Sequence, residues 1–345
     1  MIRKIKNMKI NTKLWLTIII ISLIIIVSKS FNISQKKNYF FERNFVKVNN
    51  LKSIKISILD SINNHDFINA TNNIITVYNK KQIDNNIYRI DIYDISKNKI
   101  MKSFETSLPT NSISYIKDSC LVYIDKFILF SKNIIDNKIS NISNSNCKIY
   151  NAFPLANKKE YIFLGESKIN NITKVGFFKS NIITKKLTII KEIKTGTIKT
   201  NKNFLIYTGI FSTNSNYITY TSNKTSNVFI FGLSGNLVNH IKTKENVPNP
   251  EIIEFNNTFG YKRGFTFSTN IATFIKKDDV YILSERVEKS NNAVVDKYSL
   301  TTGEYLSSFN IKSINTDNQN INNIFQMNDT IIFNSNYKFI SYINK

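Results

Sequence analysis

Short alternations of apolar and polar residues run through the chain from about residue 40 to its end. Two examples are "RIDIYDISKNKIMKSF" (89–104) and "VVDKYSLTTGEYLSSF" (294–309), in which two alternating halves flank a polar centre. Alternation with a period of two predicts β-strands, and the polar centre predicts a turn. Past residue 35 no apolar pattern with a period of 3.6 residues lasts long enough to predict a helix. We therefore expect many short antiparallel strands.

A second kind of hairpin precedes these stretches and recurs along the chain. It is clearest in "SYIKDSCLVYID" (114–125), "ATFIKKDDVYILS" (272–284) and "NIFQMNDTIIFNS" (323–335). A four-stranded unit that recurs at roughly 40–50 residues is typical of a β-propeller, because one sheet buries both faces only between two others. We therefore predict an all-β fold, a six-bladed β-propeller, with second strands centred on Ile75, Val122, Ile162, Ile218, Tyr281 and Ile332.

The two ends of the repeat region predict how the ring closes. After Ile332 only "KFISYINK" remains, which is one strand short of a complete blade. Residues 45–58 alternate as well, and we expect them to supply the missing outer strand of a propeller domain at 45–345. Seven blades remain an alternative if residues 244–270 form a degenerate blade, and a pair of β-sandwiches is a third. No linker rich in Gly, Ser or Pro divides the region into two domains.

The repeat resembles the six-bladed TolB-like or NHL-like β-propellers of bacterial envelopes. The resemblance covers residues 45–345 and depends on the Asp-containing turns and on hairpins such as "TTGEYLSSF". The WD dipeptide of WD40 repeats is absent, and the sole tryptophan, Trp15, lies outside the repeats. The resemblance implies a rigid platform whose inter-blade loops and second-to-third-strand loops open on one face, around a central channel.

The N-terminus carries the most specific signal in the chain. Residues 1–13 are basic, residues 14–28 form an uncharged apolar run, and residues 29–44 have the composition of a linker. Basic residues before an apolar run indicate that the N-terminus stays in the cytoplasm while the rest crosses the membrane. We expect the propeller to lie outside the cytoplasm, in the periplasm or outside the cell.

Two interpretations of the apolar run stay open. It is 15 residues long, whereas a comfortable membrane span needs about 20 and a signal-peptide apolar region has about 7–15. The triplet Ser28-Lys29-Ser30 is a poor match to a cleavage site, and no cysteine follows that would carry a lipid. We favour an uncleaved transmembrane helix at residues 14–28 over a cleaved signal peptide.

The net charge of +23 adds little about partners. Lysines far outnumber arginines and are scattered, and dispersed charge is a weak indication of nucleic-acid binding. We consider nucleic acid an improbable partner. Electrostatic binding of an anionic envelope polymer remains an alternative function.

A candidate ligand site lies in the loops that the propeller would place around its channel. The longest is 244–270, which contains Tyr261, Lys262 and Arg263, and the loop 285–292 contains Arg286. Of the five arginines, Arg3 and Arg43 precede the repeats, and Arg89 joins Arg263 and Arg286 at positions on the expected mouth. Arginine suits bidentate recognition of carboxylate or phosphate. An anion site and simple hydrogen bonds to loop carbonyls are both consistent with this pattern.

Few residues suggest covalent or metal chemistry. Cys120 and Cys147 have no metal-ligand spacing; they form one disulfide or stay two separate thiols. The two histidines, His65 and His240, are far apart, and no nucleophile, zinc or phosphate-loop motif occurs. We expect no metal and no cofactor. The sequence favours a scaffold that binds a protein or peptide partner in the envelope; the enzymatic alternative is a lyase or hydrolase acting on an anionic saccharide or lactone.

Overall fold

The structure is a computed structural model that describes residues 20–24, 41–47, 51–55 and 65–344, the last range with gaps at 72–73, 85–86, 95–96, 98, 110–111, 118–119, 158, 196–198, 215, 246, 257, 263–266, 286–292, 312–320, 328–329 and 336–338. The chain forms two compact units, Met1–Glu42 and Arg43–Lys345. The described residues of the second unit are all-β apart from one short helix, so the expected all-β class is confirmed.

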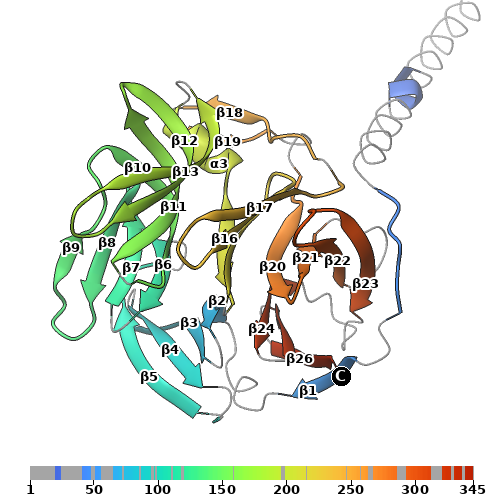
Figure 1. Ribbon diagram of the computed structural model, residues 1–345, viewed down its shortest axis with the longest axis horizontal. Helices are drawn as coiled ribbons and strands as arrows, with labels where there is room; N and C mark the ends of the chain where they lie inside the picture. Colours follow the sequence, from blue (N-terminus) through green and yellow to red (C-terminus); the bar gives the residue numbers. More distant parts are fainter. Residues whose placement is uncertain are drawn as a thin grey trace, which may run out of the picture. The chain divides into compact units, whose positions relative to one another are not determined.

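Five four-stranded antiparallel sheets are built from strands that follow one another along the chain (Figure 1). We number these blades 1 to 5. Blade 1 comprises β2 (His65–Thr71), β3 (Ile74–Asp84), β4 (Ile87–Asp94) and β5 (Lys99–Thr106), and blade 2 comprises β6 (Ile113–Lys117), β7 (Cys120–Asp125), β8 (Ile128–Asn133) and β9 (Ile139–Asn141). Blade 3 comprises β10 (Cys147–Pro154), β11 (Glu160–Ile169), β12 (Ile172–Asn181) and β13 (Leu187–Thr195), and blade 4 comprises β14 (Gly209–Thr213), β15 (Tyr217–Ser222), β16 (Asn227–Gly232) and β17 (Leu237–Lys242). Blade 5 comprises β20 (Asn270–Lys276), β21 (Asp279–Ser284), β22 (Ala293–Ser299) and β23 (Tyr305–Ile311).

A sixth sheet joins the two ends of the propeller unit. It contains β24 (Ile321–Met327), β25 (Thr330–Ser335) and β26 (Phe339–Asn344), and β1 (Leu51–Lys55) pairs antiparallel with β26 as its outer strand. The inner strand β24 contacts β20 of blade 5 and β2 of blade 1. We call this sheet the composite sheet, because its strands come from both ends of the unit.

The blade count therefore differs from the expectation. The structure is a β-propeller with five blades, and the expected six are not confirmed. The physical reason is that the last sheet is assembled from distant segments rather than from four consecutive strands. Seven blades are wrong, because the described part of residues 244–269 forms only the two-stranded hairpin β18 (Ile252–Phe255) and β19 (Thr258–Tyr261).

The hairpins expected at 89–104 and 294–309 are confirmed as strands three and four of blades 1 and 5. In blade 5 the turn is closed by two backbone bonds, from Ser299 N to Glu304 O and from Gly303 N to Ser299 O, each 2.9 Å long. Gly303 has a φ of 72°, a conformation that glycine adopts without steric cost. The sequence "TTGE" is therefore the turn that this backbone requires.

The core lies between neighbouring blades. Phe177 on β12 packs against Phe229 and Phe231 on β16 and Tyr220 on β15, with ring centroids 4.7–5.2 Å apart. These side chains are buried on facing sheets of blades 3 and 4. Burial of aromatic faces between sheets is the main favourable term in such a core, at roughly 25 cal/mol for each Å² of apolar area.

Among the described N-terminal residues, 20–24 are helical, with Ile20, Ile21, Leu23 and Ile24 exposed. The rest of the apolar run at 14–28 lies outside the described residues. Within the part that is described, no helix is long and apolar enough to span a membrane. The transmembrane helix thus stays a prediction.

A glycine at the centre of blade 3 allows a direct test of this packing. A Cβ on Gly165 would lie 2.1 Å from the carbonyl oxygen of Lys148, a backbone atom that has little freedom to move. We expect Gly165→Ala to lower the free energy of unfolding by about 1–3 kcal/mol. The measurement is urea unfolding of the full chain in detergent.

The matched control is Gly260→Ala on β19, where a Cβ would meet nothing within 4 Å. We expect this variant to stay within about 0.5 kcal/mol of the wild type. Equal effects of the two substitutions would contradict the described packing of blade 3.

Candidate functional site

The third and fourth strands of blades 1 and 5 share a polar pattern that the other hairpins lack. Asp91 lies opposite Ser103 in blade 1, and Asp296 lies opposite Ser308 in blade 5. Each serine hydroxyl donates to its aspartate, at 2.6 Å and 2.5 Å respectively. A tyrosine follows each aspartate by two residues. The equivalent cross-strand pairs in blades 3 and 4 are Phe178 with Ile189 and Phe229 with His240.

The two aspartates obtain their cation from different parts of the chain. In blade 1, Arg89 is on the same strand as Asp91, and its Nε lies 2.9 Å from Oδ2. In blade 5 the residue two positions before the aspartate is Val294. Arg43, from the segment before the propeller strands, contacts both oxygens of Asp296, with Nε 2.9 Å from Oδ1 and a terminal nitrogen 3.0 Å from Oδ2. Such bidentate pairs are the strongest arginine–carboxylate contacts.

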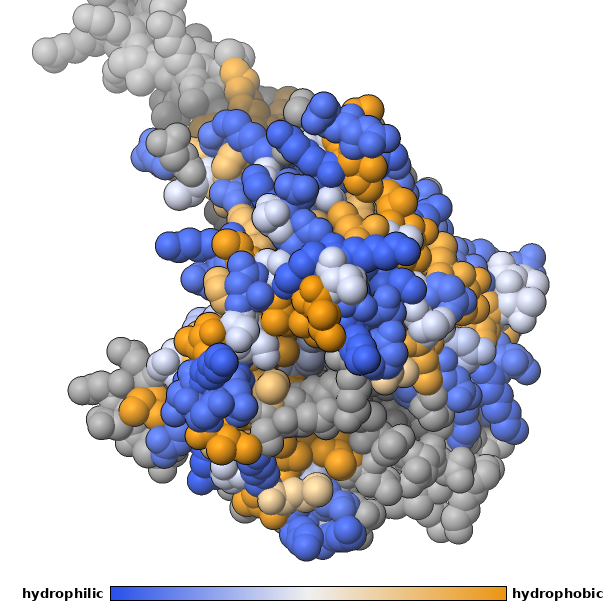
Figure 2. Space-filling model, turned by 60° about the vertical axis from the view of Figure 1, so that its left-hand side comes forward, coloured by the Kyte–Doolittle hydropathy of each residue, from blue (hydrophilic) through white to orange (hydrophobic). Residues whose placement is uncertain are grey.

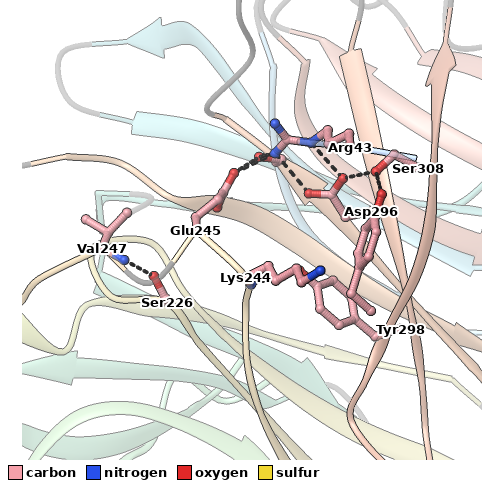
Figure 3. A network of polar contacts seen from close by, with 10 residues as sticks. Arg43, Ser226, Lys244, Glu245, Val247, Asp296, Tyr298 and Ser308 are labelled. Carbon is pink, nitrogen blue, oxygen red and sulfur yellow. Dashed lines mark hydrogen bonds and ion pairs between the residues drawn. The ribbon is translucent and has the colours of Figure 1, made fainter. Parts of the chain in front are cut away.

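Arg43 also joins blade 5 to the connection that leaves blade 4 (Figure 3). Its terminal nitrogen donates to Glu245 Oε1 at 2.6 Å and to Ser284 Oγ at 3.0 Å. Glu245 follows β17, and its position is held by hydrogen bonds from Thr243 N and Val247 N to Ser226. The guanidinium therefore lies where three segments meet: its own, the exit of blade 4, and strands β21 and β22.

Residues 43–46, here called the strap, add to the open edge of blade 5. The backbone of Ser308 on β23 donates to Asn44 O and accepts from Val46 N, both at 2.8 Å, in a parallel bridge centred on Phe45. Asn44 N donates to the hydroxyl of Tyr305 at 2.9 Å. Because the Ser308 hydroxyl donates to Asp296, the Tyr305 hydroxyl is the donor in its 2.7 Å bond with Ser308. The strap covers a strand edge that would otherwise be unpaired.

The charges in this network are almost fully removed from water. The side chains of Arg43, Glu245 and Asp296 are 6%, 1% and 4% exposed. Burial raises the pKa of Glu245; hydrogen bonds from Ser284 and the charge of Arg43 lower it in part, and the charge of Asp296 raises it further. Within the described structure, Glu245 Oε2 has no hydrogen-bond partner. One guanidinium thus serves two carboxylates, and one acceptor atom is left unused.

The two aspartates make a matched pair for mutation. Asp296→Asn removes a charge that faces a buried Arg43, and we expect it to lower the free energy of unfolding by about 3–5 kcal/mol. The Arg89 side chain is 42% exposed, so Asp91→Asn should cost only about 1–2 kcal/mol. Chemical unfolding of both variants measures the difference. An equal cost would show that burial of the cation does not matter.

The pH dependence of stability tests the state of Glu245. Its folded pKa is raised above the ordinary value of 4.5, so ionisation favours the unfolded chain. As the pH rises from about 4.5 towards the folded pKa, the wild type should lose stability relative to Glu245→Gln, which does not ionise. Unfolding free energies of both proteins between pH 4 and pH 8 measure this. A difference that moves in favour of the wild type with rising pH would contradict it.

The candidate ligand residues from the sequence fall in two places. Arg89 is paired with Asp91 on β4, whereas Tyr261 ends β19, which Figure 1 shows on the opposite side of the propeller. The Tyr261 hydroxyl donates to Leu205 O at 2.9 Å, and Lys262 Nζ lies 2.7 Å from Glu251.

These contacts of Arg89, Tyr261 and Lys262 are made within the protein, which is the structural alternative to an anion site that the sequence left open. Arg263 and Arg286 lie outside the described residues. The anion site therefore stays a prediction.

A separate buried carboxylate links blade 3 to the helix α3 (Thr200–Ile206). Glu166 on β11 accepts hydrogen bonds from the Tyr150 hydroxyl, from Asn203 Nδ2 at 2.7 Å and from Thr200 Oγ1 at 2.9 Å. Lys148 Nζ lies 2.6 Å from the Thr200 hydroxyl. Burial, and then the contact with Glu166, raise the pKa of Tyr150. The network fixes α3 on the propeller.

The two cysteines are free thiols, so the disulfide considered from the sequence is not formed. Cys120 begins β7 in blade 2 and Cys147 begins β10 in blade 3. Burial raises the pKa of Cys147, an effect that the hydroxyl of Ser167, 3.6 Å away, offsets in part. Within the described ranges, no three His, Cys, Asp or Glu side chains lie close enough together to hold a metal ion.

Comparisons with known proteins describe the fold alone. No family model and no curated protein matches the chain. A Bacteroides thetaiotaomicron protein of unknown function is 13% identical, with 85% of this chain and 76% of that chain covered and a TM-score of 0.45. A member of the DUF4221 family from Bacteroides vulgatus is 10% identical, with 86% and 98% covered and a TM-score of 0.45.

A third similar structure is regucalcin, a calcium-binding protein from Agrobacterium tumefaciens. It is 7% identical, with 88% of this chain and 95% of that chain covered and a TM-score of 0.45. At these identities and scores, neither a ligand nor the TolB-like or NHL-like family follows. The chain is a β-propeller, as its own sheet topology shows.

Proposed function

We propose that this chain is a propeller scaffold of the cell envelope that binds a protein partner through the hairpin β18–β19. Propellers commonly serve as rigid platforms, and their functions depend on the loops that they carry. The observation that supports this proposal is that one face of the hairpin is braced on the propeller while the other presents exposed apolar side chains.

The inner face of the hairpin rests on α3. The register pairs Glu254 with Phe259 and Ile252 with Tyr261, which places these four side chains on one face. Lys199, the residue before α3, lies 2.6 Å from Glu254 and 5.5 Å from the centre of the Phe259 ring. The Tyr261 hydroxyl donates to the last turn of α3. These contacts hold the hairpin at a fixed angle.

The outer face is open and apolar. Ile253 is 48% exposed and Phe255 is 71% exposed, and Gly260, the partner of Ile253 in the register, faces open space. Thr258, the partner of Phe255, completes this face within the two strands. Exposed apolar side chains on a rigid support are typical anchors of protein interfaces.

Charge indicates the chemistry of the partner. Lys199, Lys202, Lys224 and Lys262 lie next to α3, on it or beside the hairpin, where Glu254 pairs with Lys199 and Glu251 pairs with Lys262. The whole chain carries a net charge of +23, and on the face in Figure 2 hydrophilic side chains surround smaller apolar patches. The partner that we propose is therefore an acidic protein surface with a pocket for the Phe255 side chain.

The same proposal includes the cellular location of the protein and the way in which the propeller ring closes. The basic flank and the apolar run at 14–28 support a membrane anchor with the propeller outside the cytoplasm. The contacts of β24 with β20 and β2 support a role for the composite sheet as a sixth blade that closes the ring, as in the TolB-like and NHL-like propellers that the repeat resembles.

Site-specific photo-crosslinking in intact cells tests the binding surface. A photoreactive amino acid in place of Phe255 should give a covalent adduct with a protein, and Ile253→Ser in the same chain should reduce the adduct at least fivefold. The matched control position is Ile183, on the turn between β12 and β13, which is 70% exposed and should give no such adduct.

Three results would overturn the proposal. They are equal adducts at both positions, no protein adduct at Phe255 in native envelopes, and an adduct with an anionic polysaccharide. The last result would instead support the polymer-binding or saccharide-cleaving alternatives.

A further inference from the structure

We propose that the cleft between blades 4 and 5 is a recognition site for an extended peptide segment that contains an arginine, and that the strap fills this site within its own chain. The site is separate from the β18–β19 hairpin, so the inference does not depend on the proposed function. It follows from the pocket around the Arg43 guanidinium and from the open edge of β23.

The pocket is built for a guanidinium. Two carboxylates, Asp296 and Glu245, and the hydroxyl of Ser284 face the Arg43 side chain, and all three residues are buried. The fork of Arg43 matches both oxygens of Asp296, a geometry that an ammonium group does not reproduce. Without Arg43 the two buried carboxylates would lose the cation that contacts them both, which is costly. The pocket is therefore incomplete until an arginine enters.

Blade 1 shows that the arginine need not come from elsewhere. There the same aspartate–serine pair is satisfied by Arg89, two residues before Asp91 on the same strand. Blade 5 has Val294 at that position and takes its arginine from outside the blade. The carboxylates of blade 5 and of the blade 4 exit thus form a binding site for an arginine from another segment. In this structure that arginine is Arg43 of the same chain.

The neighbouring strand edge defines the rest of the ligand. Ser308 offers one donor and one acceptor to an added parallel strand, and the strap uses both. The side chains of Phe45 and Val46, which follow in the strap, are 50% and 45% exposed, so they contribute little to the specificity of the site. The ligand class is therefore an extended segment with arginine in the pocket and little further side-chain specificity, a form of β-strand addition.

The strap is well placed to exchange with such a segment. It contains the first residues of the compact unit that begins at Arg43. Its attachments include the Arg43 side-chain contacts, two backbone bonds to Ser308, and one bond to Tyr305. Displacement of the strap would expose the carboxylates of Asp296 and Glu245 and the backbone groups of Ser308 to a peptide that also carries an arginine.

The test uses the full chain with Arg43→Ala and Val46→Pro, which removes the guanidinium and the backbone donor to Ser308. The probe is a fluorescent peptide of residues 41–48, "FERNFVKV". We expect saturable binding to this variant that is at least tenfold tighter than to the wild type, whose site is occupied. Adding Asp296→Asn, or replacing the peptide arginine with citrulline or lysine, should weaken the binding at least tenfold. Equal binding to variant and wild type, or no effect of these changes, would overturn the proposal.

A second measurement covers the case in which the double variant does not fold. Arg43→Ala alone leaves the backbone bonds of the strap in place and empties only the pocket. Ethylguanidinium should raise the melting temperature of Arg43→Ala by several degrees more than that of the wild type, and ethylammonium should not. The same shift in both proteins, or an equal effect of the two cations, would refute a guanidinium pocket.

Discussion

The interaction on which the rest of this structure depends is the burial of both faces of each blade against its neighbours. Strand β11 shows this directly: seven consecutive residues from Tyr161 to Ser167 are buried, although their side chains alternate between the two faces. Such a strand is stable only between two other sheets, because either face alone would expose a continuous apolar surface. Radial stacking supplies a neighbour on each side, and the inner strand β24 of the composite sheet contacts both β20 and β2.

Burial between blades also explains why charges inside the clefts must be paired. Asp91 and Asp296 occupy equivalent positions at which blades 3 and 4 have Phe178 and Phe229. A carboxylate at an apolar position loses its hydration and must recover it from donors and a cation. In both blades the neighbouring serine provides one donor. The cation is local in blade 1 and comes from the strap in blade 5, so the need for charge balance ties the segment before the propeller to the cleft.

The strands, their hairpin turns and the β-propeller fold could be predicted from the sequence, because each depends on residues close together in the chain. The stretch "TTGE" contains the glycine that its turn requires, and alternation identifies β22 and β23 around it. The pairing of β1 with β26 could be anticipated only because the last repeat is one strand short. The number of blades could not be read reliably, since the 244–270 stretch has strand-like residues but forms only a hairpin braced on a helix.

The site could be predicted only in part, and Arg43 shows why. Its partners Glu245 and Asp296 lie 202 and 253 residues away, and no local pattern connects them. The aligned Asp-x-Tyr and serine of residues 89–104 and 294–309 did carry a signal, since one copy has an arginine two residues before its aspartate and the other has valine. A buried aspartate without a local cation requires one from a distant segment, and only five arginines are available in the whole chain. Comparing repeats for a missing charge partner, rather than searching loops for clustered arginines, would have directed attention to Arg43.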